Sequence, residues 1–187
     1  GAPKGKNVEA ARLWEKKGTD SPYFKKWFGK SKVVDEEGNP QVVHHGTGRK
    51  FEAFKEQPGA DLGFHFGTSS QARNRIVEKF PYATKENLQD LIIRGEAHIL
   101  PVYLSIEKPL RIPDTSLFHS SHGEFISALS DHGIQVDRGS SHSSVARKIK
   151  SKGYDGLVYK NKYEGKGDSY IAFESSQVKS AFPAPFG

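Results

Sequence analysis

The sequence predicts an α+β fold in which two packed, mostly antiparallel sheets surround a cleft and helices flank the sheets. Short apolar strands alternate with helical segments, and strands far apart in the sequence carry polar residues of the kinds that form ligand sites. The 187 residues include 12 Phe, 7 Tyr and 2 Trp, which supply large apolar side chains for a core. We therefore expect a helical N-terminal extension over residues 1–20 and one domain over residues 21–187.

The first half of the chain combines capping and turn signals with short apolar runs. Ser21-Pro22 starts a helix, because serine caps a helix and proline suits its first position. Residues 36–40 form a turn between two apolar runs, which predicts a β-hairpin. The elements expected here are a helix over 8–16, a helix after Ser21-Pro22, a hairpin of 32–34 with 41–43, and a helix from Ser69-Ser70 to about residue 80.

The second half is predicted from the same signals. Thr84 and Asn87 start a helix that ends near Arg94-Gly95, since glycine commonly follows the last helical turn. Residues 139–144 are rich in Ser and Gly and read as a flexible loop before a helix. The other expectations are a strand over 98–106, an irregular segment over 109–119, helices over 124–130 and 145–150, and closing strands over 156–159 and 169–173.

Composition excludes several classes of protein. The chain has no cysteine, so disulfide scaffolds and thiolate metal sites are excluded. No apolar run reaches the roughly 18 residues of a membrane span, and no signal peptide opens the chain. The absence of Met suggests a domain processed or excised from a larger polypeptide. We expect no membrane partner and a cytoplasmic location, or delivery into the cytoplasm of a target cell.

The net charge of +6 favours acidic partners, including the pyrophosphate of a dinucleotide or a nucleic acid. Lysines gather near the N-terminus and again over residues 147–152. Basic surfaces are common, and no segment resembles a nucleic-acid-binding motif. From charge alone, we interpret these clusters mainly as solvated faces.

The most informative motif is an apolar strand that leads into His45-Gly46-Thr47. A histidine at the end of a strand places its ring at the rim of the sheet, and the following glycine exposes backbone hydrogen-bonding groups there. Two backbone groups and one imidazole can then converge on a small polar molecule.

This motif resembles the first NAD-binding element of the diphtheria-toxin-like and poly-ADP-ribose-polymerase-like ADP-ribosyltransferases. Two further segments, 61–72 and 153–173, follow in the order that this family requires. Together with residues 177–180 they resemble the small ADP-ribosyltransferase domains of phage and mobile-element polyvalent proteins and of secreted toxins. The resemblance spans roughly residues 23 to 182 and implies two sheets around an NAD cleft.

The resemblance also implies roles for individual residues. His45 would bond the adenosine ribose, Gly46 would hold the nicotinamide amide through its backbone, and Thr47 would support the turn. Where the polymerase-like pattern has a stacking tyrosine, this chain has His65, whose imidazole can also stack on nicotinamide. Strand alternation predicts that His65 faces the cleft while its two phenylalanine neighbours enter the core. The remaining expected NAD contacts are Gly63, Phe64, Asn161 and Tyr170.

The catalytic acid is less well defined by sequence. Cleavage of the bond between nicotinamide and ribose passes through an oxocarbenium-like state, which a nearby carboxylate stabilises. The polymerase-like pattern places glutamate where this chain has Ser169. The candidates are therefore Glu164, in a glycine-flanked loop near Asn161, and Asp168, whose side chain a bulge could redirect.

Three functions compete on this sequence. The first is transfer of ADP-ribose from NAD to a protein or nucleic-acid acceptor, without a metal, by an effector, toxin or phage-encoded modifier. The second is an NAD- or nucleotide-binding module without turnover, or an RNA-directed 2'-phosphotransferase-like activity. The third is a histidine-based metal hydrolase, which the histidine spacings do not favour, because His44 and His45 are adjacent on a strand and face opposite sides.

Overall fold

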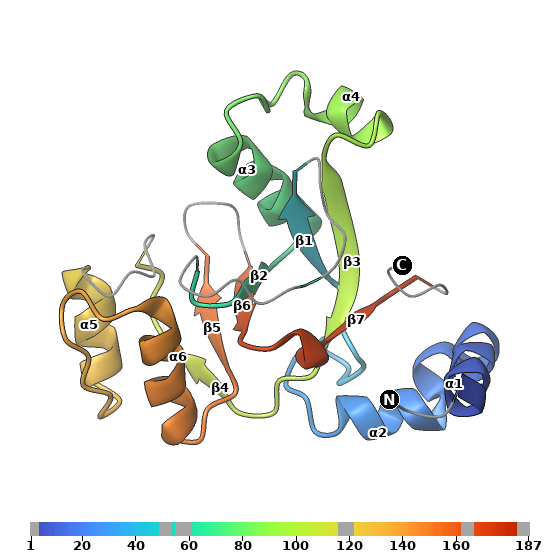
Figure 1. Ribbon diagram of the computed structural model, residues 1–187, viewed down its shortest axis with the longest axis horizontal. Coiled ribbons are helices and arrows are strands. Elements are labelled where there is room, and N and C mark those ends of the chain that lie inside the picture. Colours follow the sequence, from blue (N-terminus) through green and yellow to red (C-terminus); the bar gives the residue numbers. More distant parts are fainter. Residues whose placement is uncertain (1–3, 49–53, 55–60, 116–121, 162–166, 183–187) are drawn as a thin grey trace.

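Seven strands form two sheets in the computed structural model, which describes residues 4–48, 54, 61–115, 122–161 and 167–182 (Figure 1). One sheet has the order β1 (Val43–Thr47), β3 (His98–Leu104), β7 (Val178–Ser180). The other has the order β2 (Phe64–Phe66), β6 (Asp168–Ala172), β5 (Gly156–Lys160), β4 (Pro109–Arg111). Every strand pair is antiparallel except β4 with β5. The predicted α+β fold with two mostly antiparallel sheets is confirmed.

Helices surround the two sheets on three sides. In Figure 1, α5 and α6 lie beside the four-stranded sheet, α1 and α2 lie below the β7 end of the other sheet, and α3 and α4 lie above. The helices are α1 (Lys4–Lys17), α2 (Pro22–Phe28), α3 (Ser69–Lys79), α4 (Leu88–Ile93), α5 (Gly123–Ser130) and α6 (His142–Ser151), with short 3-10 turns at Gly18–Asp20 and Ser175–Gln177. No described helix is long and apolar enough to span a bilayer.

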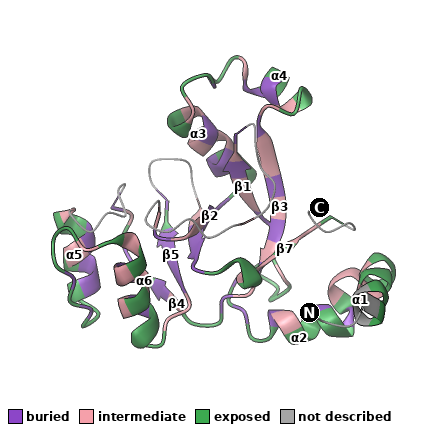
Figure 2. Ribbon diagram, viewed as in Figure 1, coloured by how far each residue is buried: buried purple, intermediate pink, exposed green. Residues whose placement is uncertain are grey.

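The four-stranded sheet is buried on both faces, and Figure 2 shows its strands largely in the buried colour. One face packs against the three-stranded sheet through Phe66 and Tyr170, which belong to the same buried cluster as Val102. The other face packs against α5 and α6 through Leu157 and Ile171. Alternate residues of β6 therefore point into different layers, as the two-residue period of a strand requires. This alternation sends Ser169 to one layer and its two neighbours to the other.

The predicted hairpin forms only in part. Its turn is closed by one antiparallel bridge between Val34 and Pro40 and by a hydrogen bond from the Gln41 N–H to the Val33 carbonyl. Proline has no N–H with which to extend that ladder. The strand that carries the His-Gly-Thr motif pairs instead with β3, with Val43 opposite Val102.

Three local predictions also need correction. Helix α3 is capped by Thr68 rather than by Ser69-Ser70, because Thr68 and Gln71 form a reciprocal capping box. Helix α6 begins at His142 rather than near residue 145, because the Ser141 side chain accepts a hydrogen bond from the Ser144 backbone N–H and caps the helix there. The segment expected to be irregular contains β4, whose parallel partner β5 lies far along the sequence and leaves no local signal.

An isolated β-bridge joins the two sheets where the motif begins. The His44 N–H donates to the Gly67 carbonyl at 2.7 Å, and the Gly67 N–H donates to the His44 carbonyl at 2.9 Å. Residue 67 directly follows β2, so this bridge holds the ends of β1 and β2 together. The two strands with the candidate histidines are thereby fixed side by side.

Candidate functional site

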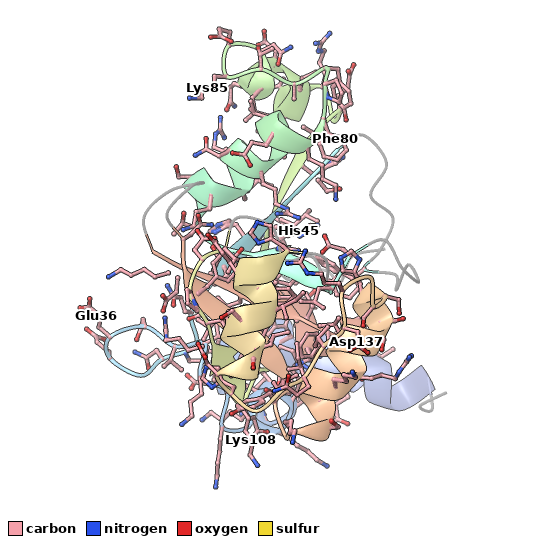
Figure 3. All side chains as sticks on the ribbon, turned by 90° about the vertical axis from the view of Figure 1, so that its left-hand side faces the viewer. Glu36, His45, Phe80, Lys85, Lys108 and Asp137 are labelled. Carbon is pink, nitrogen blue, oxygen red and sulfur yellow. The ribbon has the colours of Figure 1, made fainter. Side chains whose placement is uncertain are left out.

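His44 and His45 point to opposite sides of β1, as the strand period predicts. His45 is partly buried, and its ring packs against Phe54 and Phe66 with centroid distances of 5.1 and 5.4 Å. Its Nδ1–H donates to the carbonyl oxygen of His65 at 2.7 Å. Burial lowers the pKa of His45 to about 4, so the ring is neutral at pH 7. Figure 3 shows His45 near the centre of the molecule.

His44 faces the other way and lies between two hollows. Its Nδ1 atom is buried and makes no hydrogen bond within the described residues. Burial also lowers the pKa of His44. The backbone of Gly67 opposes part of this effect. The motif assigned the ligand contact to His45, whereas the ring that lines both hollows is that of His44, on the opposite side of the strand.

Gly46 allows helix α3 to lie directly on β1. A Cβ atom at this position would overlap the carbonyl oxygen of Ala72 and would lie 3.0 Å from Ile76 Cγ1. Gly63 has a similar place against β6, where a Cβ atom would overlap the Ala172 carbonyl oxygen. Both glycines are therefore required for close backbone packing, which is a role beyond the ligand contacts expected from sequence.

Asp61 and Arg75 fix the ring of His65. The Nε2–H of His65 donates to Asp61 Oδ1 at 3.0 Å, and Arg75 Nη2 donates to Asp61 Oδ2 at 3.4 Å. The Asp61 carboxylate also accepts the Leu62 N–H at 2.7 Å. Partial burial alone would raise the pKa of Asp61, but these hydrogen bonds and the charge of Arg75 hold the pKa well below its usual range. Sequence reasoning missed both partners, although Asp61 lies four residues before His65.

His65 lines the smaller of two hollows. This hollow has a volume of about 10 Å³, the space of one water molecule. Its walls come from β1, β2, α3, β5 and β6 and are formed by His44, Gly46, His65, Phe66, Gly67, Gln71, Ala72, Arg75, Tyr159 and Ser169. Residues from all three motif segments, which only their order in the sequence had linked, thus meet in space.

The larger hollow is an open cleft of about 350 Å³, within the range of small-molecule sites. It is lined by Val34, Gln41, Val42, Val43, His44, Gly67, Thr68, Ser69, Asp168 and Tyr170. His44 and Gly67 belong to both hollows, so the two adjoin at the bridge between the sheets.

A buried polar network supports the wall that both hollows share. Gln71 Oε1 accepts the Ser169 hydroxyl and the Thr68 N–H, each at 2.9 Å. The Gln71 amide also donates to the Gly167 carbonyl at 3.2 Å, and the Asn161 amide donates to Ser169 Oγ at 2.9 Å. The Asn161 N–H reaches the same Gly167 carbonyl at 2.9 Å. Ser169, in the position where glutamate was expected, is thus a structural residue.

Asp168 lies at the rim of the larger cleft and is paired with Arg111. The guanidinium donates two hydrogen bonds to the carboxylate, at 3.1 and 2.9 Å. Tyr170, two residues later on β6, lies in the same cleft, and burial raises the pKa of its phenol. The other candidate acid, Glu164, lies outside the described residues.

Comparison with known families bears directly on this arrangement. A family model described as "ADP-ribosyltransferase in polyvalent proteins" matches residues 35–184, which is most of the chain. The chain belongs to this family of ADP-ribosyltransferases. No curated protein and no solved structure matches it. Family membership supports ADP-ribosylation as the general activity, with NAD as the co-substrate and a macromolecular acceptor.

In this member of the family, the predicted site residues fall into two groups. Gly46 and His65 line the smaller hollow, and Asp168 and Tyr170 line the larger one. The remaining described candidates line neither hollow: His45, Thr47, Gly63, Phe64 and Asn161. Among them, Thr47 ends β1 opposite His98, and Phe64 packs against the core between the sheets.

No group of three or more His, Asp or Glu residues within the described ranges could hold a metal ion. His44 and His45 are separated by the plane of the strand, while His65 Nε2 is engaged by Asp61 and His45 Nδ1 by a backbone carbonyl.

Proposed function

We propose that this chain transfers ADP-ribose from NAD to a macromolecular acceptor and releases nicotinamide, in the role of an effector, toxin or phage-encoded modifier. The observation that carries the proposal is the pair of adjoining hollows, which offers His65 and the Gly46 backbone on one side and an acidic rim on the other. One dinucleotide can contact both because the hollows share His44 and Gly67. The smaller hollow must widen by side-chain movement to admit a nicotinamide ring.

In the proposed reaction, the bond between the ribose C1' carbon and the nicotinamide nitrogen breaks, and its electron pair leaves with nicotinamide. An acceptor nucleophile then forms a bond to C1' and loses a proton. A carboxylate beside C1' stabilises the positive charge that develops between these events. Either Glu164 or Asp168 is proposed for this role. Since Arg111 already compensates the charge of Asp168, Glu164 is the stronger candidate.

The direct test of function is incubation with NAD labelled in its adenylate part and a cell lysate, followed by nuclease or protease digestion of the labelled product. Nicotinamide release without a lysate provides a second measurement, since water can replace the acceptor. A metal chelator should change neither result. The placement of Ser169 in the expected acid position favours one alternative, an NAD-binding module without turnover. NAD binding without labelling and without nicotinamide release would support that alternative.

His65 is proposed to contact the nicotinamide. We expect His65→Ala to lower nicotinamide release about tenfold or more, because a group that positions the reacting ring is lost. His65→Tyr should retain much of the activity if the contact is stacking. Equal losses in two folded variants would indicate hydrogen bonding instead, and full activity of His65→Ala would contradict any role of this residue.

Asp61 is proposed to position His65. We expect Asp61→Asn to lower the turnover number for nicotinamide release about tenfold, because a neutral amide holds the His65 Nε2–H less strongly than a carboxylate does. Proton NMR of the free protein should show a protected His65 ring N–H that exchanges faster in the variant. Asp35→Asn is the control, since Asp35 only accepts backbone N–H groups in an exposed turn. An unchanged ring N–H signal in Asp61→Asn would contradict the assignment.

A further inference from the structure

The net charge of the protein is concentrated ahead of the region that matches the family. We call residues 4–34 the basic arm; it contains α1, α2 and the segment that leads to the bridge at Val34. Nine of the 28 Lys and Arg residues lie in the arm, but only three of the 22 Asp and Glu residues do. The arm therefore carries the whole formal charge of +6, and residues 35–187 contain 19 residues of each sign.

The apolar residues of the arm are used to attach it to the domain. Phe24 packs against Tyr103 of β3, with ring centroids 5.1 Å apart, and stacks on Trp14 and Phe28 at 5.4 and 5.5 Å. The Trp14 and Trp27 ring N–H groups donate to the carbonyls of Phe182 and Ser176 at 2.9 and 2.8 Å. The arm is thus a fixed part of the fold, and its large side chains are mostly committed.

The cations of the arm remain available. Six cations of the arm are exposed, and within the described ranges no ion pair engages any of them. They are Arg12, Lys16, Lys17, Lys26, Lys30 and Lys32. Two of the three acidic residues already have partners in the arm, since Asp20 pairs with Lys25 and Glu9 accepts the Tyr23 hydroxyl. Elsewhere, by contrast, Arg75, Arg111 and Lys150 are paired with carboxylates.

We propose that the basic arm binds the phosphate backbone of a nucleic acid. Lysines on flexible stems suit repeated phosphates, which need no fixed donor geometry. The exposed cations of α1 lie over residues 12–17, about 8 Å of helix, and the others follow on α2 and in the segment after it, so the arm offers several separate phosphate contacts. An acidic protein partner fits less well, because lysine is depleted in protein interfaces and the arm exposes few large apolar anchors, Val8 and Tyr23.

The test is fluorescence anisotropy of the whole protein with a labelled RNA or DNA of random sequence, over a series of salt concentrations. We expect a Kd of about 1 to 100 μM at physiological salt and an affinity that falls steeply as salt increases. Replacing Lys16, Lys26, Lys30 and Lys32 by Gln should weaken binding at least about tenfold and reduce the slope of log K against log salt by about 3 to 4. These side chains are exposed, so the fold should persist, and thermal unfolding verifies that it does.

The matched control replaces Lys85, Arg94, Arg138 and Lys152 by Gln. This variant has the same net charge as the first, but the changed residues are exposed on other parts of the molecule, and Figure 3 shows Lys85 near the far end, beside α4. We expect its affinity to stay within about twofold of the unchanged protein. Equal weakening by both variants, absence of nucleic-acid binding, or equally tight binding of polyglutamate would overturn the proposal. The measurement uses no NAD, so it is independent of the proposed transfer reaction.

Discussion

Replacing Glu164 by Gln should lower the rate of nicotinamide release about 100-fold or more while the affinity for NAD changes little. A carboxylate beside the developing oxocarbenium acts on the transition state much more than on bound NAD. Glutamine keeps nearly the same volume, so the loss reports the negative charge. Turnover comes from initial rates at saturating NAD, and binding comes from calorimetry on the same preparation.

Asp168→Asn is the comparison that identifies the acid. Asp168 lies in the larger cleft, but two hydrogen bonds from Arg111 compensate its charge. We therefore expect a smaller loss of turnover than for Glu164→Gln. If Asp168→Asn abolishes turnover and Glu164→Gln does not, Asp168 is the acid and the argument from Arg111 is wrong. Full turnover in both variants would exclude the proposed mechanism, whatever the fold.

Sequence reasoning succeeded where periodicity and motif order carry the information. The alternation around His65 correctly placed Phe66 in the core between the sheets, since a strand has a period of two. The order of the three motif segments correctly indicated one shared region, because His44, His65 and Ser169 line the same hollow.

Sequence reasoning failed where a partner lies far along the chain. Strand β4 has only three residues, and its pairing with β5 depends on a crossover that includes α5 and α6. The pairing of β1 with β3 also could not be read from the nearby turn at residues 36–40. No sequence signal distinguishes Arg75 from the other polar positions of α3, and only its distance to Asp61 in the folded chain reveals its contact with the site.

Gly46→Ala should lower the free energy of unfolding by about 3 kcal/mol, which corresponds to a fall in Tm of roughly 6 to 12 °C for a chain of this size. The added Cβ would overlap the backbone carbonyl of Ala72, and a backbone atom inside a helix cannot move aside as a flexible side chain can. Either α3 must shift away from β1 or the strand must bend. Both responses displace Gln71 and Arg75 from the smaller hollow, so NAD affinity should fall as well.

Gly123→Ala is the matched control. Gly123 begins helix α5, and a Cβ atom there would meet nothing closer than the Arg138 guanidinium, at 3.6 Å. Alanine favours a helix, so the free energy of unfolding of this variant should lie within about 0.5 kcal/mol of that of the unchanged protein or slightly above it. A glycine required only for its backbone contact with a ligand would lower NAD affinity without lowering Tm. If Gly46→Ala unfolds at the same temperature as Gly123→Ala, α3 does not lie on β1 as closely as described, and Gly46 has only the ligand-binding role that its motif implies.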